Sequence, residues 1–239
     1  MKDPKVRLYV DHPLGQGQCI ALTAEQSNYL FAVMRLGPGA AVRAFNGHDG
    51  EWTATVARAD KRKGALTVGT SSAPQVSPPD IWLLFAPLKK TQTDFVVEKA
   101  VELGVARLQP ILTDFTNAER VRTERLQARA TEAAEQCGAT FVPDVAKAVK
   151  LATLLSGWPE PRGLIFCDEG QSGHRAEMPD LPPPAAILIG PEGGFSQAER
   201  TRIAALPQSR PISLGPRILR AETAAIAALT LWQACNGDW

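Results

Sequence analysis

The sequence has few of the residues that form disulfides or bind metals. Its 239 residues include three histidines and four cysteines, and the cysteines (Cys19, Cys137, Cys167 and Cys235) lie far apart without a CxxC pair. Cysteines in this pattern do not indicate a disulfide framework or a zinc site. The sequence therefore predicts free thiols and no bound metal.

Long hydrophobic runs are also missing. No apolar run approaches the roughly 18 residues that cross a membrane, and the opening MKDPKVRLYVDHPLG lacks the apolar segment of a secretion signal. A composition with 44% apolar and 21% charged residues is ordinary for a globular protein. We therefore expect a cytoplasmic protein without a membrane partner.

Neither sign of charge dominates, since 26 Lys and Arg residues face 25 Asp and Glu residues. The distribution is uneven, because residues 1–75 carry nine basic against six acidic residues and the remainder carries 17 against 19. This excess favours contact between the N-terminal part and a polyanion. A solvated surface with scattered charge explains it equally well.

The pattern of elements changes at SSAPQVSPPD, residues 71–80, where Ser and Pro crowd together. Before this segment the sequence predicts one helix at about 24–36, whose start, TAEQ, fits a capping box. Short strands are expected on either side of it, at 6–10, 41–45, 51–59 and 64–70. Short strands with one helix predict a small β-barrel over residues 1–74.

After this segment, strands and helices alternate, which is typical of a mostly parallel α/β sheet. The run IWLLFA at 81–86 is continuously apolar, as in a strand that is covered on both faces. Helices are expected at about 93–103 and 123–138, and strands at 105–112, 163–167, 185–190 and 211–215. Residues 75–239 are thus predicted to form one α/β domain.

Two motifs near the C-terminus carry the strongest functional signal. In LIGPEGGFSQAE, residues 188–199, a strand ends in a glycine loop, and Ser196 and Glu199 have the spacing of a capping box. The motif SLGPRILRAETAAIAAL at 213–229 repeats this design and ends in a helix that is apolar nearly all round. Neither loop matches a dinucleotide or nucleoside-triphosphate motif. The residues alone predict a pocket lined by backbone for a small ligand, or two structural turns.

At the level of families, the sequence resembles the small-subunit ribosomal RNA uridine N3-methyltransferases called RsmE, within the SPOUT superfamily. Both C-terminal motifs are similar to the two hallmark segments of that family, and the likeness extends to VMRLGPG at 33–39. The likeness also covers FVVEKAVELGVARLQPI at 95–111 and EQCGATFVPDV at 135–145. The resemblance implies a PUA-like β-barrel RNA-binding domain at 1–74 and a SPOUT methyltransferase domain with a C-terminal trefoil knot at 75–239. It also implies a homodimer.

The resemblance further implies S-adenosylmethionine as methyl donor, without a metal, and a set of site residues. The loop after 163–167, with Cys167, Asp168 and Glu169, is expected as a third wall of the pocket. Arg35 is an expected RNA contact and the stronger candidate of its helix, because Ala32 stands where many relatives have arginine. Arg7 is the other expected RNA contact, because it matches a basic position of the family. The expected donor contacts are Leu188, Ile189, Gly190, Gly194, Leu214, Gly215, Ile218, Leu219 and Arg220.

The implied reaction is methylation at N3 of a specific uridine in small-subunit (16S) ribosomal RNA, expected in the assembled 30S subunit. Neutral uridine N3 carries a proton, so the enzyme must remove it or stabilise the anion. Arg220 and Glu222 are the expected catalytic residues, with Glu222 as a base or as a group that orients Arg220, and Glu192 as a further carboxylate. Ribose 2′-O-methylation and a non-catalytic RNA-binding role are the alternatives.

Overall fold

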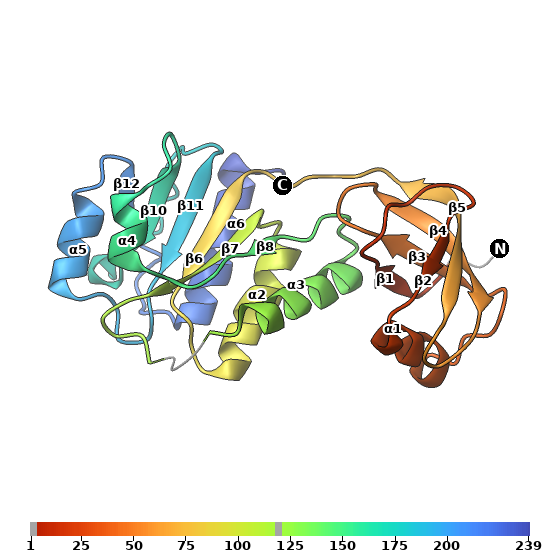
Figure 1. Cartoon of the computed structure of the whole chain (residues 1–239). Coiled ribbons are helices and arrows are strands. Elements are labelled where there is room, and N and C mark those ends of the chain that lie inside the picture. The colour runs from red at the N-terminus through yellow and green to blue at the C-terminus, as the bar shows by residue number, and fades with distance from the viewer. Residues whose placement is uncertain (1–3, 118–120) are drawn as a thin grey trace. The chain divides into compact units, whose positions relative to one another are not determined.

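The computed structural model describes residues 4–117 and 121–239 (Figure 1). The chain divides into two compact units. The first comprises Met1–Ser77 together with Ala134–Val142, and the second comprises Pro78–Ala133 and Pro143–Trp239. The sequence pattern places a boundary between residues 74 and 75, but it gives no sign that a later segment belongs to the first unit.

In the described part of the first unit, one sheet carries the core. Its strands run in the order β1 (Arg7–Tyr9), β3 (Ala41–Phe45), β4 (Glu51–Arg58), β5 (Ala65–Ala73) and β2 (Cys19–Ala21). Strand β1 is parallel to β3, and the other neighbours are antiparallel. Alternate residues of the strands point inward, among them Leu8, Ile20, Val42, Ala54 and Leu66.

The helix of this unit begins as the sequence predicts but ends earlier. In α1 (Ala24–Asn28), Thr23 and Gln26 form the predicted capping box. A π-helix, η1 (Tyr29–Val33), continues it, because the Met34 amide donates to the Tyr29 carbonyl at 2.9 Å. Arg35 then adopts a left-handed φ of 56°. This conformation cannot continue a right-handed helix, so the predicted helix at 24–36 stops short.

Hydrogen bonds from Arg7 connect the segment Ala134–Val142 to the first unit. Its guanidinium donates to the carbonyl oxygens of Ala134 at 2.6 Å, Glu135 at 3.1 Å and Ala139 at 3.0 Å, and to Glu51 Oε2 at 2.6 Å. It also lies over the Phe45 ring at 4.5 Å. Four of the five N–H donors of Arg7 are therefore engaged inside the unit.

The second unit is an α/β domain in which every strand pair is parallel among the described residues. The main order is β12, β10, β11, β6, β7, β8, and β9 also pairs with β7. The strands are β6 (Ile81–Phe85), β7 (Arg107–Leu112), β8 (Asp144–Val145), β9 (Val149–Lys150), β10 (Gly163–Cys167), β11 (Ala185–Ile189) and β12 (Ser209–Ile212). The helices are α2 (Lys90–Glu102), α3 (Thr123–Cys137), α4 (Leu151–Ser156), α5 (Gln197–Ala204) and α6 (Ala221–Asn236), with a short 3-10 helix, η2 (Glu169–Gln171).

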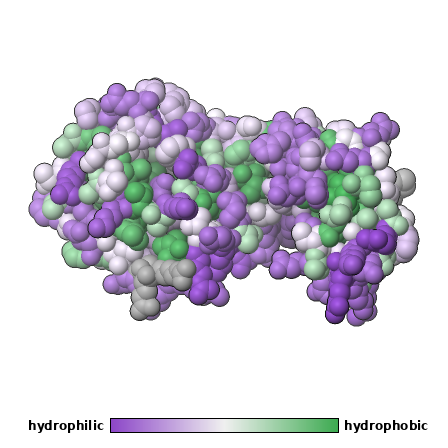
Figure 2. Space-filling view, viewed as in Figure 1, coloured by the Kyte–Doolittle hydropathy of each residue, from purple (hydrophilic) through white to green (hydrophobic). Residues whose placement is uncertain are grey.

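The central strands of this sheet are covered on both faces, because every residue of β10 and β11 is buried. Leu151 of α4 and Ile203 of α5 join one core cluster with Leu84, Leu164 and Leu188, while α6 packs against β11 and α2. The face seen in Figure 2 is mostly hydrophilic, with hydrophobic residues in scattered patches. No helix of the described residues is long and apolar enough to cross a membrane.

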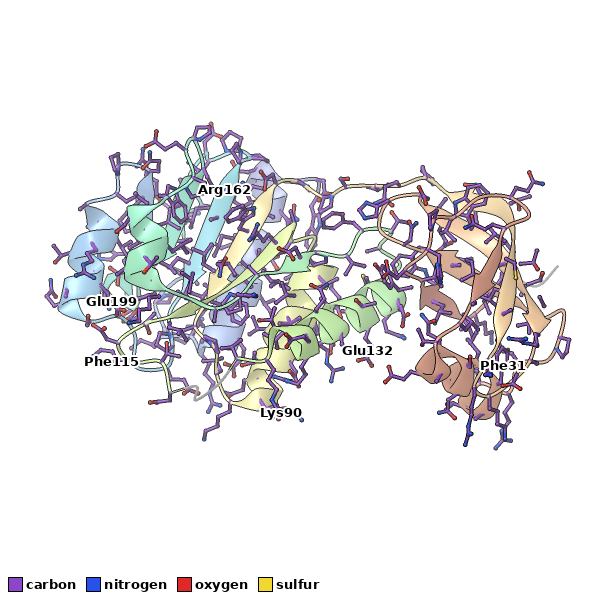
Figure 3. The ribbon with its side chains drawn as sticks, in the orientation of Figure 1. Phe31, Lys90, Phe115, Glu132, Arg162 and Glu199 are labelled. Atoms are coloured by element: carbon purple, nitrogen blue, oxygen red, sulfur yellow. The ribbon has the colours of Figure 1, made fainter. Side chains whose placement is uncertain are left out.

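Arg162 joins the ends of three strands at the amino edge of the sheet. Its guanidinium donates to both carboxylate oxygens of Asp80, at 3.0 and 2.8 Å, and to the Ala185 carbonyl at 3.0 Å. It also stacks on the Trp82 ring at 3.8 Å. Figure 3 shows Arg162 at one end of the strands and Phe115 and Glu199 near the other end. The opposite, carboxyl edge is thus left for the loops.

Candidate active site

A cavity lies where three parallel strands end side by side. Strand β10 pairs with β12 on one side and with β11 on the other. Because the carboxyl ends of parallel strands meet at one edge, the loops that follow these strands converge. Residues of all three loops line the cavity, together with the first turn of α6.

The first loop runs from Gly190 to Ser196 and is held at its far end by a predicted capping box. The Ser196 hydroxyl accepts from the Glu199 amide at 3.3 Å, and the Glu199 carboxylate accepts from the Ser196 amide at 2.9 Å. The other carboxylate oxygen of Glu199 accepts from the Asp114 amide at 2.9 Å. Glu199 is buried, so it connects the glycine loop to the segment after β7.

At two glycines of this loop, the surrounding atoms leave no room for a side chain. A Cβ at Gly190 would lie 2.6 Å from Phe195 Cε2, and a Cβ at Gly194, where φ is +70°, would collide with the Glu169 carboxylate. Both positions therefore present bare backbone.

The second loop follows β12 and is held by Ser213. The buried Ser213 hydroxyl donates to the His174 carbonyl at 3.1 Å and accepts from the Gly215 amide, also at 3.1 Å. Gly215 has a φ of +116°, a conformation that a residue with a side chain rarely adopts. Ile218 and Arg220, farther along the loop, are exposed at the mouth of the cavity.

The third wall is acidic and comes from the loop after β10. Asp168 and Glu169 line the cavity, and both carboxylates pair with the guanidinium of Arg200 on α5. Cys167 precedes them and is buried. Burial raises the pKa of its thiol well above the usual range, so the thiol stays protonated near neutral pH.

The structure brings together the predicted donor contacts with one exception. Leu188 is fully buried in the core cluster beneath the first loop. The other eight line the cavity: Ile189, Gly190, Gly194, Leu214, Gly215, Ile218, Leu219 and Arg220. Cys167, Asp168 and Glu169, expected as a third wall, line it as well.

Beside the mouth of the cavity, two carboxylates accept hydrogen bonds from the same side-chain amide. Gln92 of α2 donates through Nε2 to Glu192 Oε1 and to Glu222 Oε1, each at 3.4 Å. Glu192 lines the cavity, whereas Glu222 lies outside its lining, in the first turn of α6. Glu222 Oε2 is buried and has no hydrogen-bond partner among the described residues. Among the described residues, the Glu222 carboxylate thus accepts a hydrogen bond from Gln92 and none from Arg220.

The two arginines expected to contact RNA differ in accessibility. Arg35 is exposed next to Val33 and Met34, whose exposed fractions are 61% and 40%. The Arg7 side chain is only 10% exposed and its donors are engaged within the first unit. Arg35 is therefore the one of the two that lies free for a direct contact.

Comparisons with known proteins agree with this arrangement. A family model described as RNA methyltransferase domain matches residues 75–233, and one described as RNA methyltransferase PUA domain matches residues 22–68. A ribosomal RNA small subunit methyltransferase E from Synechocystis is 32% identical over 88% of this chain and 71% of its own. The chain belongs to this family. The predicted order, a PUA-like domain followed by an α/β methyltransferase domain, is thereby confirmed.

Two solved structures cover nearly the whole chain. A methyltransferase from Legionella pneumophila, in complex with the bound cofactor SAM, has a TM-score of 0.90 and 31% identity over 98% of this chain and 99% of its own. A ribosomal RNA small subunit methyltransferase E from Neisseria gonorrhoeae, bound to S-adenosyl methionine, has a TM-score of 0.86 and 26% identity with the same coverage. The similarity to these two structures thus spans both units of the chain.

Three polar residues at the site have no counterpart among the sequence predictions. Gln92 and Arg200 come from helices that flank the cavity, and Arg217 lines it beside Ile218. No motif marks Gln92 or Arg200, because each acts across the fold on residues from other elements. Within the described residues, no group of His, Cys, Asp and Glu is arranged to hold a metal ion.

The raised pKa of the Cys167 thiol predicts selective alkylation. In the native protein at pH 8, iodoacetamide should modify the exposed Cys19, Cys137 and Cys235 and leave Cys167 unmodified. All four should react after unfolding in guanidinium chloride. Peptide mass spectrometry measures both states, and fast native labelling of Cys167 would contradict the buried environment.

Proposed function

We propose that this protein is an S-adenosylmethionine-dependent methyltransferase that modifies N3 of a uridine in 16S ribosomal RNA. The observation that carries the proposal is the cavity at the carboxyl ends of β10, β11 and β12, lined by both hallmark loops. Membership of the methyltransferase E family and the SAM-bound relatives support the same reaction. We further propose the assembled 30S subunit as the substrate and the cytoplasm as the location.

The cavity suits the methyl donor in three respects. The glycine loop presents bare backbone, since a Cβ at Gly190 or Gly194 would collide with its surroundings. Ile189, Leu214 and Leu219 supply apolar contacts of the kind that a purine ring needs. Asp168 and Glu169 are carboxylates that accept hydrogen bonds from hydroxyl or ammonium groups. When bound, S-adenosylmethionine supplies a methyl group that its positive sulfur makes electrophilic, so no metal is required.

Residues of the chain must remove the N3 proton of the uracil ring and stabilise the negative charge that develops on the ring. The Arg220 side chain is exposed at the mouth and has no hydrogen-bond or ion-pair partner among the described residues, so its guanidinium is free for the uracil oxygens. Negative charge that develops on those oxygens is stabilised by such a donor. Gln92 holds Glu222 and Glu192 close together beside the mouth. We propose that this pair takes the N3 proton, with Glu222 as the acceptor.

The reaction and the role of Arg220 are tested together. The purified protein is incubated with labelled donor and either undermethylated 30S subunits, free 16S RNA or transfer RNA, and the product nucleoside is identified by mass spectrometry. We expect N3-methyluridine from the 30S subunits. Arg220→Ala should lower kcat by about a hundredfold or more, because it removes the donor that stabilises the anion. Its fold should persist, which circular dichroism measures.

Each alternative has its own outcome in this assay. Methyl transfer to a ribose would replace the N3 assignment with 2′-O-methylation. Failure to bind the donor in calorimetry would favour a non-catalytic RNA-binding protein. Full activity of Arg220→Ala would remove this arginine from the mechanism, and Glu222→Gln compared with Glu192→Gln identifies the carboxylate that accepts the proton.

For the N-terminal domain, residues 1–74, we propose RNA binding. The match to an RNA methyltransferase PUA domain and the exposed Arg35 support this role. We propose that Arg35 contacts phosphate directly. For Arg7 we propose a contribution through the shape of the RNA-binding unit, since its guanidinium is engaged with Glu51 and three carbonyl oxygens.

The variant Arg35→Gly distinguishes the effect of the Arg35 charge on RNA binding from the effect of its backbone strain on stability. Glycine removes the cost of the left-handed conformation, about 1 kcal/mol, so the variant should be as stable as the natural protein or more stable. RNA binding should weaken. The slope of log Kd against log salt concentration should fall by about 1, because one phosphate contact fewer releases about one counterion fewer. Fluorescence anisotropy at several salt concentrations measures this. Arg202→Ala, an exposed arginine on α5, is the charge-matched control, and equal binding by both variants would contradict a role for Arg35.

We propose that the C-terminal part of the chain forms the trefoil knot of SPOUT proteins. Two features support it: β12 lies outside β10, and the chain then returns to α6, which packs on the interior strand β11. A chain trace in an experimental density map tests this directly.

We also propose a homodimer. Helix α6 is apolar nearly all round, yet Ile226 and Leu231 are only partly buried, and Phe95 of α2 is 39% exposed. Ile218 at the mouth is 76% exposed, which a second chain would cover. Light scattering should give twice the chain mass of 25.7 kDa at micromolar concentration. A mass of one chain under these conditions would contradict the dimer.

A further inference from the structure

Arg200 connects two walls of the donor cavity without lining the cavity itself. Its two terminal nitrogens pair with Asp168 Oδ1 and Glu169 Oε1, both on the loop after β10. Its Nε donates to the Phe195 carbonyl at 3.2 Å, on the glycine loop after β11. One guanidinium thus holds two loops that come from different strands.

The surroundings make this contact stronger than an ordinary surface ion pair. The exposed fractions of the side chains are 24% for Arg200, 13% for Asp168 and 36% for Glu169, so water screens the charges only in part. Asp168 Oδ1 also accepts from the Gly170 amide at 2.9 Å, which fixes the carboxylate at the start of η2. A guanidinium offers donors in a planar fork, which a lysine ammonium lacks.

The pairing with Arg200 also determines where the carboxylates of Asp168 and Glu169 lie. The Glu169 carboxylate occupies the space beside Gly194 that a Cβ would fill. Without Arg200, Asp168 and Glu169 would lose the guanidinium with which both pair, and Glu169 would lose the partner that keeps it against the glycine loop. The width and charge of the cavity therefore depend on a residue outside it.

We propose that Arg200 is a positioning residue for the methyl donor: it holds Asp168 and Glu169 in place to receive the hydroxyl or ammonium groups of the donor. The inference rests on the proposed function of the cavity. It assigns Arg200 an effect on the donor and none on RNA, because the guanidinium contacts Phe195, Asp168 and Glu169, which all lie in the donor-binding loops.

The test compares Arg200→Ala and Arg200→Lys with Arg202→Ala, which removes an exposed arginine two residues along α5. Isothermal titration calorimetry measures the Kd for S-adenosylmethionine, and steady-state kinetics measures KM for donor and for RNA. For Arg200→Ala we expect the donor Kd and KM to rise about tenfold or more, with KM for RNA unchanged. Lysine should restore part of the affinity, because it keeps the charge but not the fork. Arg202→Ala should bind as the natural protein does.

A second pair of variants keeps the proposal testable if Arg200→Ala does not fold. In a Glu169→Gln background, Arg200→Lys should cost less donor affinity than in the natural chain, because the two residues act as one unit. Equal losses in both backgrounds would overturn the positioning role, and so would natural donor affinity in folded Arg200→Ala. If the natural protein itself fails to bind the donor, the proposed function fails with it. Donor binding that is unaffected by Arg200 defeats the positioning role alone.

Discussion

The parallel pairing of β10 with both β11 and β12 is the constraint on which the site depends. Parallel neighbours point their carboxyl ends to the same edge, so three loops that are distant in sequence begin side by side. Arg162 secures the opposite edge by joining Asp80, before β6, to the Ala185 carbonyl of β11. The carboxyl edge is thereby free to carry glycines and charged residues that contribute little to the core.

The site is held together by polar side chains that each serve two segments. Glu199 caps its own helix and accepts from the Asp114 amide, Ser213 holds both Gly215 and the His174 carbonyl, and Gln92 lies between two carboxylates. Such groups are satisfied only when all their partners are in place, so the loops are ordered together. The same use of one polar group for several segments recurs in the first unit, where Arg7 joins β1 to Ala134–Val142.

Local patterns predicted much of the fold. Both capping boxes, at Thr23 and Ser196, are present, and the strand at 41–45 coincides with β3. The short strands β2, β8 and β9 and the helix α4 were not predicted, since a few residues show no period of their own. The helix expected at 24–36 ends early because Arg35 adopts a left-handed conformation. No feature of the residues from Val33 to Leu36 predicts that conformation.

The amino-acid sequence by itself determined the α/β rhythm, the two glycine loops and the family, because these depend on contiguous residues. Only the tertiary structure decided that Leu188 lies under the cavity, that Glu222 contacts Gln92, and that Arg200 stands behind Asp168 and Glu169. It also placed Ala134–Val142 in the first unit. The physical reason is that these relations are made by single side chains reaching across elements, at sequence separations such as the 130 residues between Gln92 and Glu222, where no local periodicity carries information.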